Sequence, residues 1–166
     1  MIIGGDTRES RDIQIGSHDI EAVNLEDNNI NCDPADLPYK FKYHASVYIT
    51  VLNGILTCGG IDYHYRRRSS CILQRKGSES NHFPSLNTKR HGLSLTSISD
   101  TIYAIGGSPN QNTMETINPN TDKQWKTEEL SFSVHGHCSV RLGNKIIVTG
   151  GLDEYYDVSK IILKFT

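Results

Sequence analysis

The sequence predicts an all-β fold of repeated antiparallel hairpins, and three recurring features in one register carry this prediction. A short apolar run ends in a glycine pair four times, with intervals of 55, 47 and 44 residues: Gly4-Gly5, Gly59-Gly60, Gly106-Gly107 and Gly150-Gly151. Three histidines keep the same rhythm: His44, His91 and His137. A turn sequence lies between each histidine and the next glycine pair: Asn53-Gly54, Ser99-Asp100 and Gly143-Asn144. Internal repetition of this kind is typical of repeat architectures.

The strands follow in chain order within each repeat. Residues 47–52 and 55–58 are apolar and β-branched, and the Asn-Gly pair between them predicts a tight hairpin, because both turn positions favour positive φ. A polar loop follows each glycine pair, and we expect a third strand after it, at residues 20–25, 70–75, 114–118 and 160–165. A turn at Pro119 then leads to Trp125, which opens a fourth strand. No segment has a sustained helical period.

Four strands in about 45–50 residues match one blade of a β-propeller. The run from Thr101 to Gly107, the run from Met114 to Pro119, and Trp125 after them resemble the kelch repeat. The second repeat departs from that pattern, because it has no tryptophan and its loop is enlarged at residues 63–68. The resemblance implies kelch-type β-propeller blades with these structural markers: Gly59, Gly60, Gly106, Gly107, Gly150, Gly151 and Trp125. Glycine permits close backbone approach, and tryptophan fills the wedge between blades.

The predicted region covers residues 1–166 and does not close a ring. We expect a partial blade at 1–40, blades at 41–88 and 89–132, and a partial blade at 133–166. This makes about three and a half blades, whereas closed propellers use roughly 4 to 8. The favoured interpretation is a part of a larger propeller, and a half-ring that dimerises is the alternative. Uncovered end blades predict that the isolated chain self-associates.

Composition and charge exclude several classes of partner. The net charge of −2 gives no basic excess for nucleic acid, and no apolar run is long enough for a membrane-spanning helix. The N-terminus lacks the pattern of a signal peptide. The four cysteines, Cys32, Cys58, Cys71 and Cys138, have no metal-ligand spacing. We therefore expect free thiols in a reducing, cytoplasmic compartment.

The histidines invite a metal interpretation, above all His135 and His137 beside Cys138. The repeat already accounts for His137, so we expect no metal or other cofactor. Some kelch-like propellers are copper radical oxidases, and Tyr43, His44 and His135 would have to serve such a site. No nucleophile elbow is present, and we expect a protein that is not an enzyme. Metal analysis of the purified protein would separate the two classes.

The densest charge in the chain is the run Arg66-Arg67-Arg68, which follows Tyr63 and Tyr65. Arginine and tyrosine are enriched at protein interfaces, although most charge runs are solvated loops. The kelch resemblance implies that Arg90 faces the mouth of the propeller and binds acidic peptides. Tyr43 lies at the same distance before the glycine pair of the second repeat as Arg90 does in the third. The expected partner-binding residues are Arg90, Tyr43, Arg66, Arg67, Arg68 and Asn112.

The predicted function is a protein-interaction module whose partner presents an acidic peptide segment. The kelch resemblance implies the substrate-recognition part of a cullin-based ubiquitin ligase adaptor, or an actin or cytoskeletal scaffold. Neither accompanying BTB nor F-box sequence is recognisable in these 166 residues.

Overall fold

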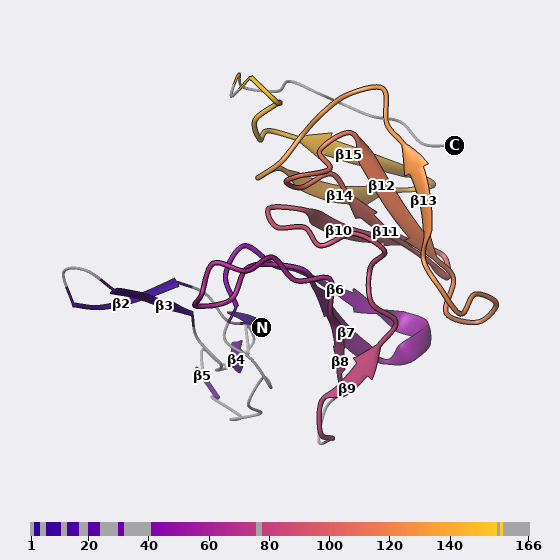
Figure 1. Ribbon diagram of the computed structural model, residues 1–166. Coiled ribbons are helices and arrows are strands. Elements are labelled where there is room, and N and C mark those ends of the chain that lie inside the picture. Colours follow the sequence, from indigo (N-terminus) through magenta and orange to yellow (C-terminus); the bar gives the residue numbers. More distant parts are fainter. Residues whose placement is uncertain are drawn as a thin grey trace.

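This structure is a computed structural model. It describes the backbone of residues 2–3, 6–10, 13–16, 20–23 and 30–31, and it describes backbone and side chains for residues 41–75, 78–155 and 157. Antiparallel strands dominate the described residues (Figure 1), and the helical element among them is the short 3₁₀ turn η1 (Thr50–Leu52). The all-β prediction is confirmed. No helix in the described ranges is long and apolar enough to cross a membrane.

Two four-stranded antiparallel sheets form the centre of the chain, each with its strands in chain order. The first sheet contains β6 (Ala45–Ile49), β7 (Gly54–Cys58), β8 (Cys71–Gln74) and β9 (Asn81–Phe83). The second contains β10 (Ser94–Ile98), β11 (Thr101–Ile105), β12 (Thr113–Ile117) and β13 (Lys126–Glu129). Trp125 directly precedes β13, as the sequence predicts.

Shorter sheets lie before and after this pair. A third sheet pairs β14 (Cys138–Leu142) with β15 (Lys145–Thr149). Toward the N-terminus, β1 (Ile2–Ile3), β4 (Ile20–Val23) and β5 (Ile30–Asn31) form a three-stranded sheet, and β2 (Asp6–Ser10) pairs with β3 (Ile13–Gly16). The hairpin β2–β3 stands where the sequence predicts only a polar loop. The predicted strand at 160–165 and the pair Gly4-Gly5 lie outside the described residues.

The sheets lie side by side, with their first strands as neighbours: β10 contacts β6 on one side and β14 on the other. One apolar cluster fills the space between the first and second sheets and includes Leu56, Ile102 and Trp125. A second cluster joins the second sheet to the third and includes Ile105, Val134 and Ile146. Burial of these side chains between sheets is the main source of stability.

Trp125 lies between the first two sheets, and only 3% of its surface is exposed. Its indole Nε1 donates a hydrogen bond to the carbonyl oxygen of Pro84 at 2.8 Å. Its ring meets that of Phe83 edge to face, with centroids 6.4 Å apart. A buried tryptophan with its N–H satisfied both fills the gap and fixes the path of the neighbouring segment.

The glycine pairs bring each second strand against the linker that enters the next sheet. Gly60 N donates to Arg90 O at 2.9 Å, and Gly107 N donates to Val134 O at 2.9 Å. Gly59 has φ +71°, and a Cβ there would lie 2.6 Å from Arg90 O. Only glycine accommodates both the positive φ and this approach. The pairs therefore hold neighbouring sheets together through the backbone.

The histidine register predicted from the sequence is wrong by two residues at one of its three positions. Backbone bridges join Lys42 to Ile61, His91 to Ser108, and His135 to Leu152, in each case at the residue after the glycine pair. The structural counterparts of His91 are thus Lys42 and His135, whereas His44 and His137 each lie two residues further on and correspond to each other. The connection between β6 and β7 comprises residues 50–53, whereas β10 and β11 are joined by residues 99–100 alone, so the first sheet carries two additional residues.

The predicted Asn-Gly hairpin also differs from the structure. Asn53 has φ 46° and follows the 3₁₀ turn, while Gly54 is already the first residue of β7 and has no positive φ. The turn is therefore a four-residue connection in place of a two-residue one. The local strand order is unaffected.

The prediction of free thiols is wrong for two cysteines. Cys58 and Cys71 form a disulfide between β7 and β8, where they stand directly opposite each other with Cα atoms 4.2 Å apart. Such a cross-strand pair has no short sequence signature, because the partners are 13 residues apart. Cys138 is free and exposed.

Candidate functional site

The loops between the second and third strands share one end of the sheets with the linkers that enter each first strand. This arrangement follows from antiparallel strand order, in which alternate connections emerge at the same end. At this end lie residues 59–70 of the first sheet, the linker residues 42–44 and 90–93, and residues 150–155 of the third sheet.

The loop at residues 61–68 is built around the carboxylate of Asp62, which is almost fully buried. Its Oδ1 accepts the backbone N–H groups of His64 and Arg66, each at 2.9 Å. Its Oδ2 accepts from Arg66 Nε at 2.9 Å and Arg68 Nη2 at 2.7 Å. One acidic side chain thereby fixes the loop in one conformation.

Burial acts to raise the pKa of Asp62, but hydrogen bonds from Arg66 and His64 and the charge of Arg66 outweigh it and lower the pKa to about 2. The carboxylate is therefore ionised throughout the neutral range. This keeps the loop assembled at the pH values at which proteins usually work.

The same loop geometry occurs again in the third sheet. Asp153 Oδ1 accepts the N–H groups of Tyr155 at 2.8 Å and Asp157 at 2.9 Å. These are the residues two and four positions further on, as in the first sheet. The backbone bond from Asp153 N to Asp157 O likewise matches that from Asp62 N to Arg66 O. An aspartate two residues after the glycine pair is the sequence signal for this loop.

The Asp62 loop presents aromatic and cationic side chains to solvent. Tyr65 is 69% exposed and Tyr63 is 60% exposed, and the Tyr63 and His64 rings are only 3.8 Å apart. Lys42, although buried, places its ammonium 4.9 Å from the centroid of the Tyr65 ring and 5.7 Å from that of Tyr43. These cation–π contacts tie the loop to the linker beside it.

The linkers extend this surface toward the second and third sheets. Gly92 N donates to Tyr43 O at 2.8 Å, and Gly136 N donates to Gly92 O at 2.7 Å, which joins three linkers in a row. The rings of Tyr43 and His91 lie 6.3 Å apart. We call this surface the tyrosine–arginine face and define it by its side chains: Tyr43, Tyr63, Tyr65, Arg66, Arg67 and His91.

Arg67 places a positive charge beside His91. Burial is the first cause that lowers the pKa of His91, and the neighbouring charges of Arg67 and His135 lower it further. The lowered pKa leaves His91 neutral at neutral pH, so the positive charge at this place is that of Arg67, which attracts carboxylates.

Tyr43 stands in a strained backbone position. Its φ is 58°, and the corresponding linker positions in the next two sheets are glycines with φ 63° and 65°, Gly92 and Gly136. A non-glycine residue in this region costs on the order of 1 kcal/mol, and such strain clusters at functional sites. Despite this backbone strain, Tyr43 occupies the position and its side chain is exposed on the face.

The prediction that Arg90 binds a partner is wrong, because its side chain is 0% exposed. Arg90 Nη2 lies 2.7 Å from Glu115 Oε1, and Nη1 donates to Gly106 O at 2.7 Å. Burial lowers the pKa of Arg90, and the charge of Glu115 opposes that effect. Glu115 also accepts the N–H groups of Asn87 and Thr88. This network clamps the linker onto the second sheet.

Some of the remaining predicted residues lie on the tyrosine–arginine face, and others do not. Arg66 and Arg67 are exposed on the face, whereas Arg68 is half-buried and turned back to Asp62. Asn112 is exposed on the loop before β12, and its carbonyl accepts from Leu130 N at 2.7 Å. Tyr43 is on the face but is not the counterpart of Arg90, since the buried Phe41 precedes the bridge residue Lys42 as Arg90 precedes His91.

Within the described residues, no group of three or more His, Cys, Asp or Glu side chains is placed to hold a metal ion. Sequence reasoning missed Lys42, His91 and Asp62. The repeated glycine-pair-x-Asp pattern could have identified Asp62, whereas the roles of Lys42 and His91 depend on contacts between sheets.

Comparison with known proteins supports the fold alone. No protein-family model matches the chain, and no curated protein matches it. A solved structure described as "Structure of YjhT" superposes with a TM-score of 0.74 at 11% sequence identity. The match covers 88% of this chain and 48% of that one, so this chain spans about half the length of its structural neighbour. The protein is therefore an all-β protein of side-by-side antiparallel sheets, with sequence distant from this neighbour.

Proposed function

We propose that this chain is a protein-interaction module of kelch type, whose sheets are propeller blades and whose tyrosine–arginine face binds an acidic segment of another protein. The observation that carries the proposal is the Asp62 loop, in which a buried carboxylate holds exposed tyrosines and arginines in place. The side-by-side sheets and their repeated glycine pairs favour the propeller interpretation.

The chemistry of the face favours carboxylates. Arginine forms paired, charge-assisted hydrogen bonds with carboxylates, and tyrosine supplies contact area with little loss of conformational freedom. The loop is already ordered by Asp62, so less entropy is lost on binding than for a loose loop. Positive charge is concentrated here although the whole chain has a net charge of −2.

The cellular role proposed from the kelch resemblance is substrate recognition in a cullin-based ubiquitin ligase adaptor, or an actin scaffold. Both roles need a face that binds protein, and neither needs a catalytic residue. A binding screen would identify the sequence that the partner presents.

The test is a peptide array of acidic sequences screened with the purified chain, followed by titration calorimetry on the best binder. We expect the combined change Tyr65→Ala, Arg66→Ala and Arg67→Ala to weaken binding at least about tenfold. The control is Arg141→Ala, an exposed arginine on the third sheet. If the triple variant binds as tightly as the unchanged chain, the face is not the binding surface.

A further inference from the structure

A pocket lies at the opposite end of the sheets from the tyrosine–arginine face, between the first and second sheets. Its volume is about 360 Å³, within the range of pockets that bind small groups. The connections that form it are residues 50–53, the segment after β8, and residues 118–125 after β12. These connections emerge at the other end from residues 61–68, because alternate turns of an antiparallel sheet face opposite ways.

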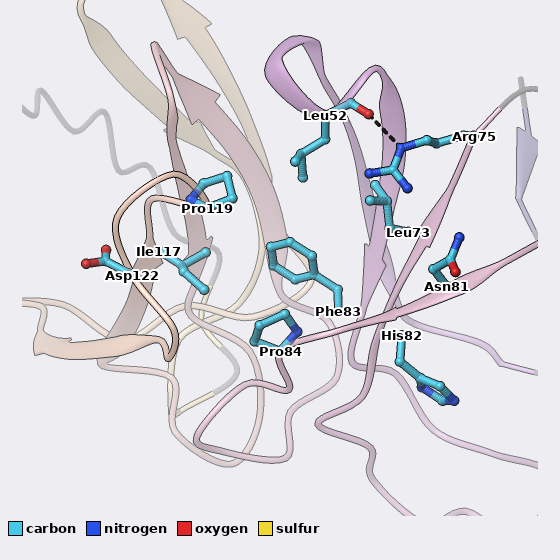
Figure 2. Close-up of a pocket in the computed structure, with 10 residues that line it drawn as sticks. All are labelled: Leu52, Leu73, Arg75, Asn81, His82, Phe83, Pro84, Ile117, Pro119 and Asp122. Carbon is cyan, nitrogen blue, oxygen red and sulfur yellow. Dashed lines mark hydrogen bonds between the residues drawn. The ribbon is translucent and has the colours of Figure 1, made fainter.

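Apolar side chains from both sheets face each other across the pocket. Figure 2 shows Phe83 and Pro84 from the first sheet facing Ile117 and Pro119 from the second, with Leu52 and Leu73 completing the lining. Pro84 is held by the indole of Trp125 at 2.8 Å. The turn that forms the second wall is held by a hydrogen bond from Asn118 N to Asp122 Oδ2 at 2.9 Å. The pocket is therefore formed before any ligand arrives.

Arg75 gives the pocket a cationic edge. Its Nε donates to Leu52 O at 2.9 Å, which fixes the guanidinium at the mouth (Figure 2). Its two Nη groups form no hydrogen bond or ion pair within the described part of the chain. The one acidic lining residue, Asp122, is already paired with Lys126 at 2.7 Å. The charge that remains available at this site is positive.

A strand edge borders the same pocket. β9 is the last strand of the first sheet, and no strand pairs with its outer side in the described residues. Asn81 and His82 of β9 are exposed and line the pocket. An extended peptide can add to such an edge through backbone hydrogen bonds and place alternate side chains in a neighbouring pocket.

We propose that this pocket is a second peptide-binding site, for an extended segment with an apolar residue followed two positions later by a carboxylate. Side chains two apart share one face of a strand, so the apolar group enters between Phe83 and Ile117 while the carboxylate meets Arg75. The charge complementarity of Arg75 and the free edge of β9 favour a peptide strand as occupant. The site is independent of the tyrosine–arginine face.

The only tryptophan of the chain reports on this site. Trp125 contacts Phe83 and Pro84, which both line the pocket, so binding changes its fluorescence and its indole N–H resonance. The probes are the blocked pentapeptide Thr-Leu-Thr-Glu-Thr and its Glu-to-Gln analogue. We expect the acidic peptide to shift the Trp125 signals and to bind roughly tenfold more tightly than the Gln analogue.

Protein variants distinguish binding in this pocket from binding at the tyrosine–arginine face. Arg75→Gln should abolish the preference for the acidic peptide. Arg141→Gln is the matched control, because Arg141 also donates its Nε to a backbone carbonyl, that of Gly143, at 2.7 Å. The double change Arg66→Gln and Arg67→Gln should leave the Trp125 response unchanged. Equal binding of the two peptides to the unchanged chain, or loss of the response in the Arg66/Arg67 variant alone, would overturn the proposal.

Discussion

At the scale of single residues, the chain buries an ion pair between a linker and a strand of the second sheet. Arg90 and Glu115 form an ion pair in which both side chains are fully buried. A buried ion pair contributes little net stability, but removal of one partner leaves an uncompensated charge. The pair therefore makes the path of residues 87–90 depend on the second sheet.

Arg90→Met should lower the free energy of unfolding by about 3–5 kcal/mol, because Glu115 would then keep a buried charge without its partner. Urea denaturation followed by Trp125 fluorescence measures the loss. The double variant Arg90→Met and Glu115→Met should regain much of it. A single variant as stable as the unchanged chain would show that the clamp is not needed for folding.

His137 makes stability depend on pH. Burial, and then the charge of His135, lower the pKa of His137 from 6.5 to about 4. The unfolded chain therefore binds a proton between pH 6.5 and 4 that the folded chain does not, so stability is lost as the pH falls through that window. The expected loss from pH 7 to pH 5 is about 2 kcal/mol.

The control for this pH effect is His137→Gln, which keeps a polar group near Ser94 Oγ, now 2.7 Å from His137 Nε2. The urea midpoints measured at pH 7 and pH 5 should lie closer together in this variant than in the unchanged chain. His91 acts in the same direction, since its pKa is also lowered, and accounts for part of what remains. An identical pH dependence of stability in both proteins would show that His137 does not cause the effect.

At the scale of strands and loops, sequence reasoning succeeds where the signal is local. The apolar runs, glycine pairs and Trp125 are each properties of a few adjacent residues, and the strands β7, β8, β11 and β12 form where these runs predict. The register of the histidines fails at His91. Two additional residues in the connection between β6 and β7 give His44 the same distance to its glycine pair as His91, although the two histidines occupy different structural positions.

The candidate site is less predictable from the sequence, because its roles depend on contacts between distant segments. The exposed run at residues 63–67 is visible in the sequence as tyrosine and arginine. The burial of Arg90 depends on Glu115, 25 residues further on, and so does not follow from its place before a strand. The Cys58–Cys71 disulfide likewise depends on strand pairing rather than on spacing.

This disulfide gives a test at the scale of a strand pair. It closes a short loop between β7 and β8, and loss of such a link costs roughly 3 kcal/mol. The variant Cys58→Ala and Cys71→Ala should lose about that much stability against urea. Alkylation of the unfolded, unreduced chain followed by mass spectrometry should leave Cys58 and Cys71 unmodified and label Cys138. Labelling of all three would contradict the pairing.

At the scale of the whole molecule, neighbouring sheets cover each other, and the third sheet has a side that no described sheet covers. In β14, alternate residues share one face, and Cys138, Val140 and Leu142 are all exposed there. Apolar residues on a sheet face are normally buried against another layer. This face is thus the part of the described surface best suited to pack against further protein.

The chain should therefore self-associate, with a larger associated fraction at higher concentration. Val140 is 56% exposed and Leu142 is 62% exposed, and their burial between copies removes apolar surface from water. Sedimentation equilibrium over a range of concentrations measures the association, with reductant present because Cys138 on the same face could cross-link copies. Val140→Lys with Leu142→Lys should shift the chain toward monomer, whereas Tyr155→Lys, an exposed aromatic on a loop of the third sheet, should not. A monomer at every concentration would mean that this face needs no covering, and the prediction would be wrong.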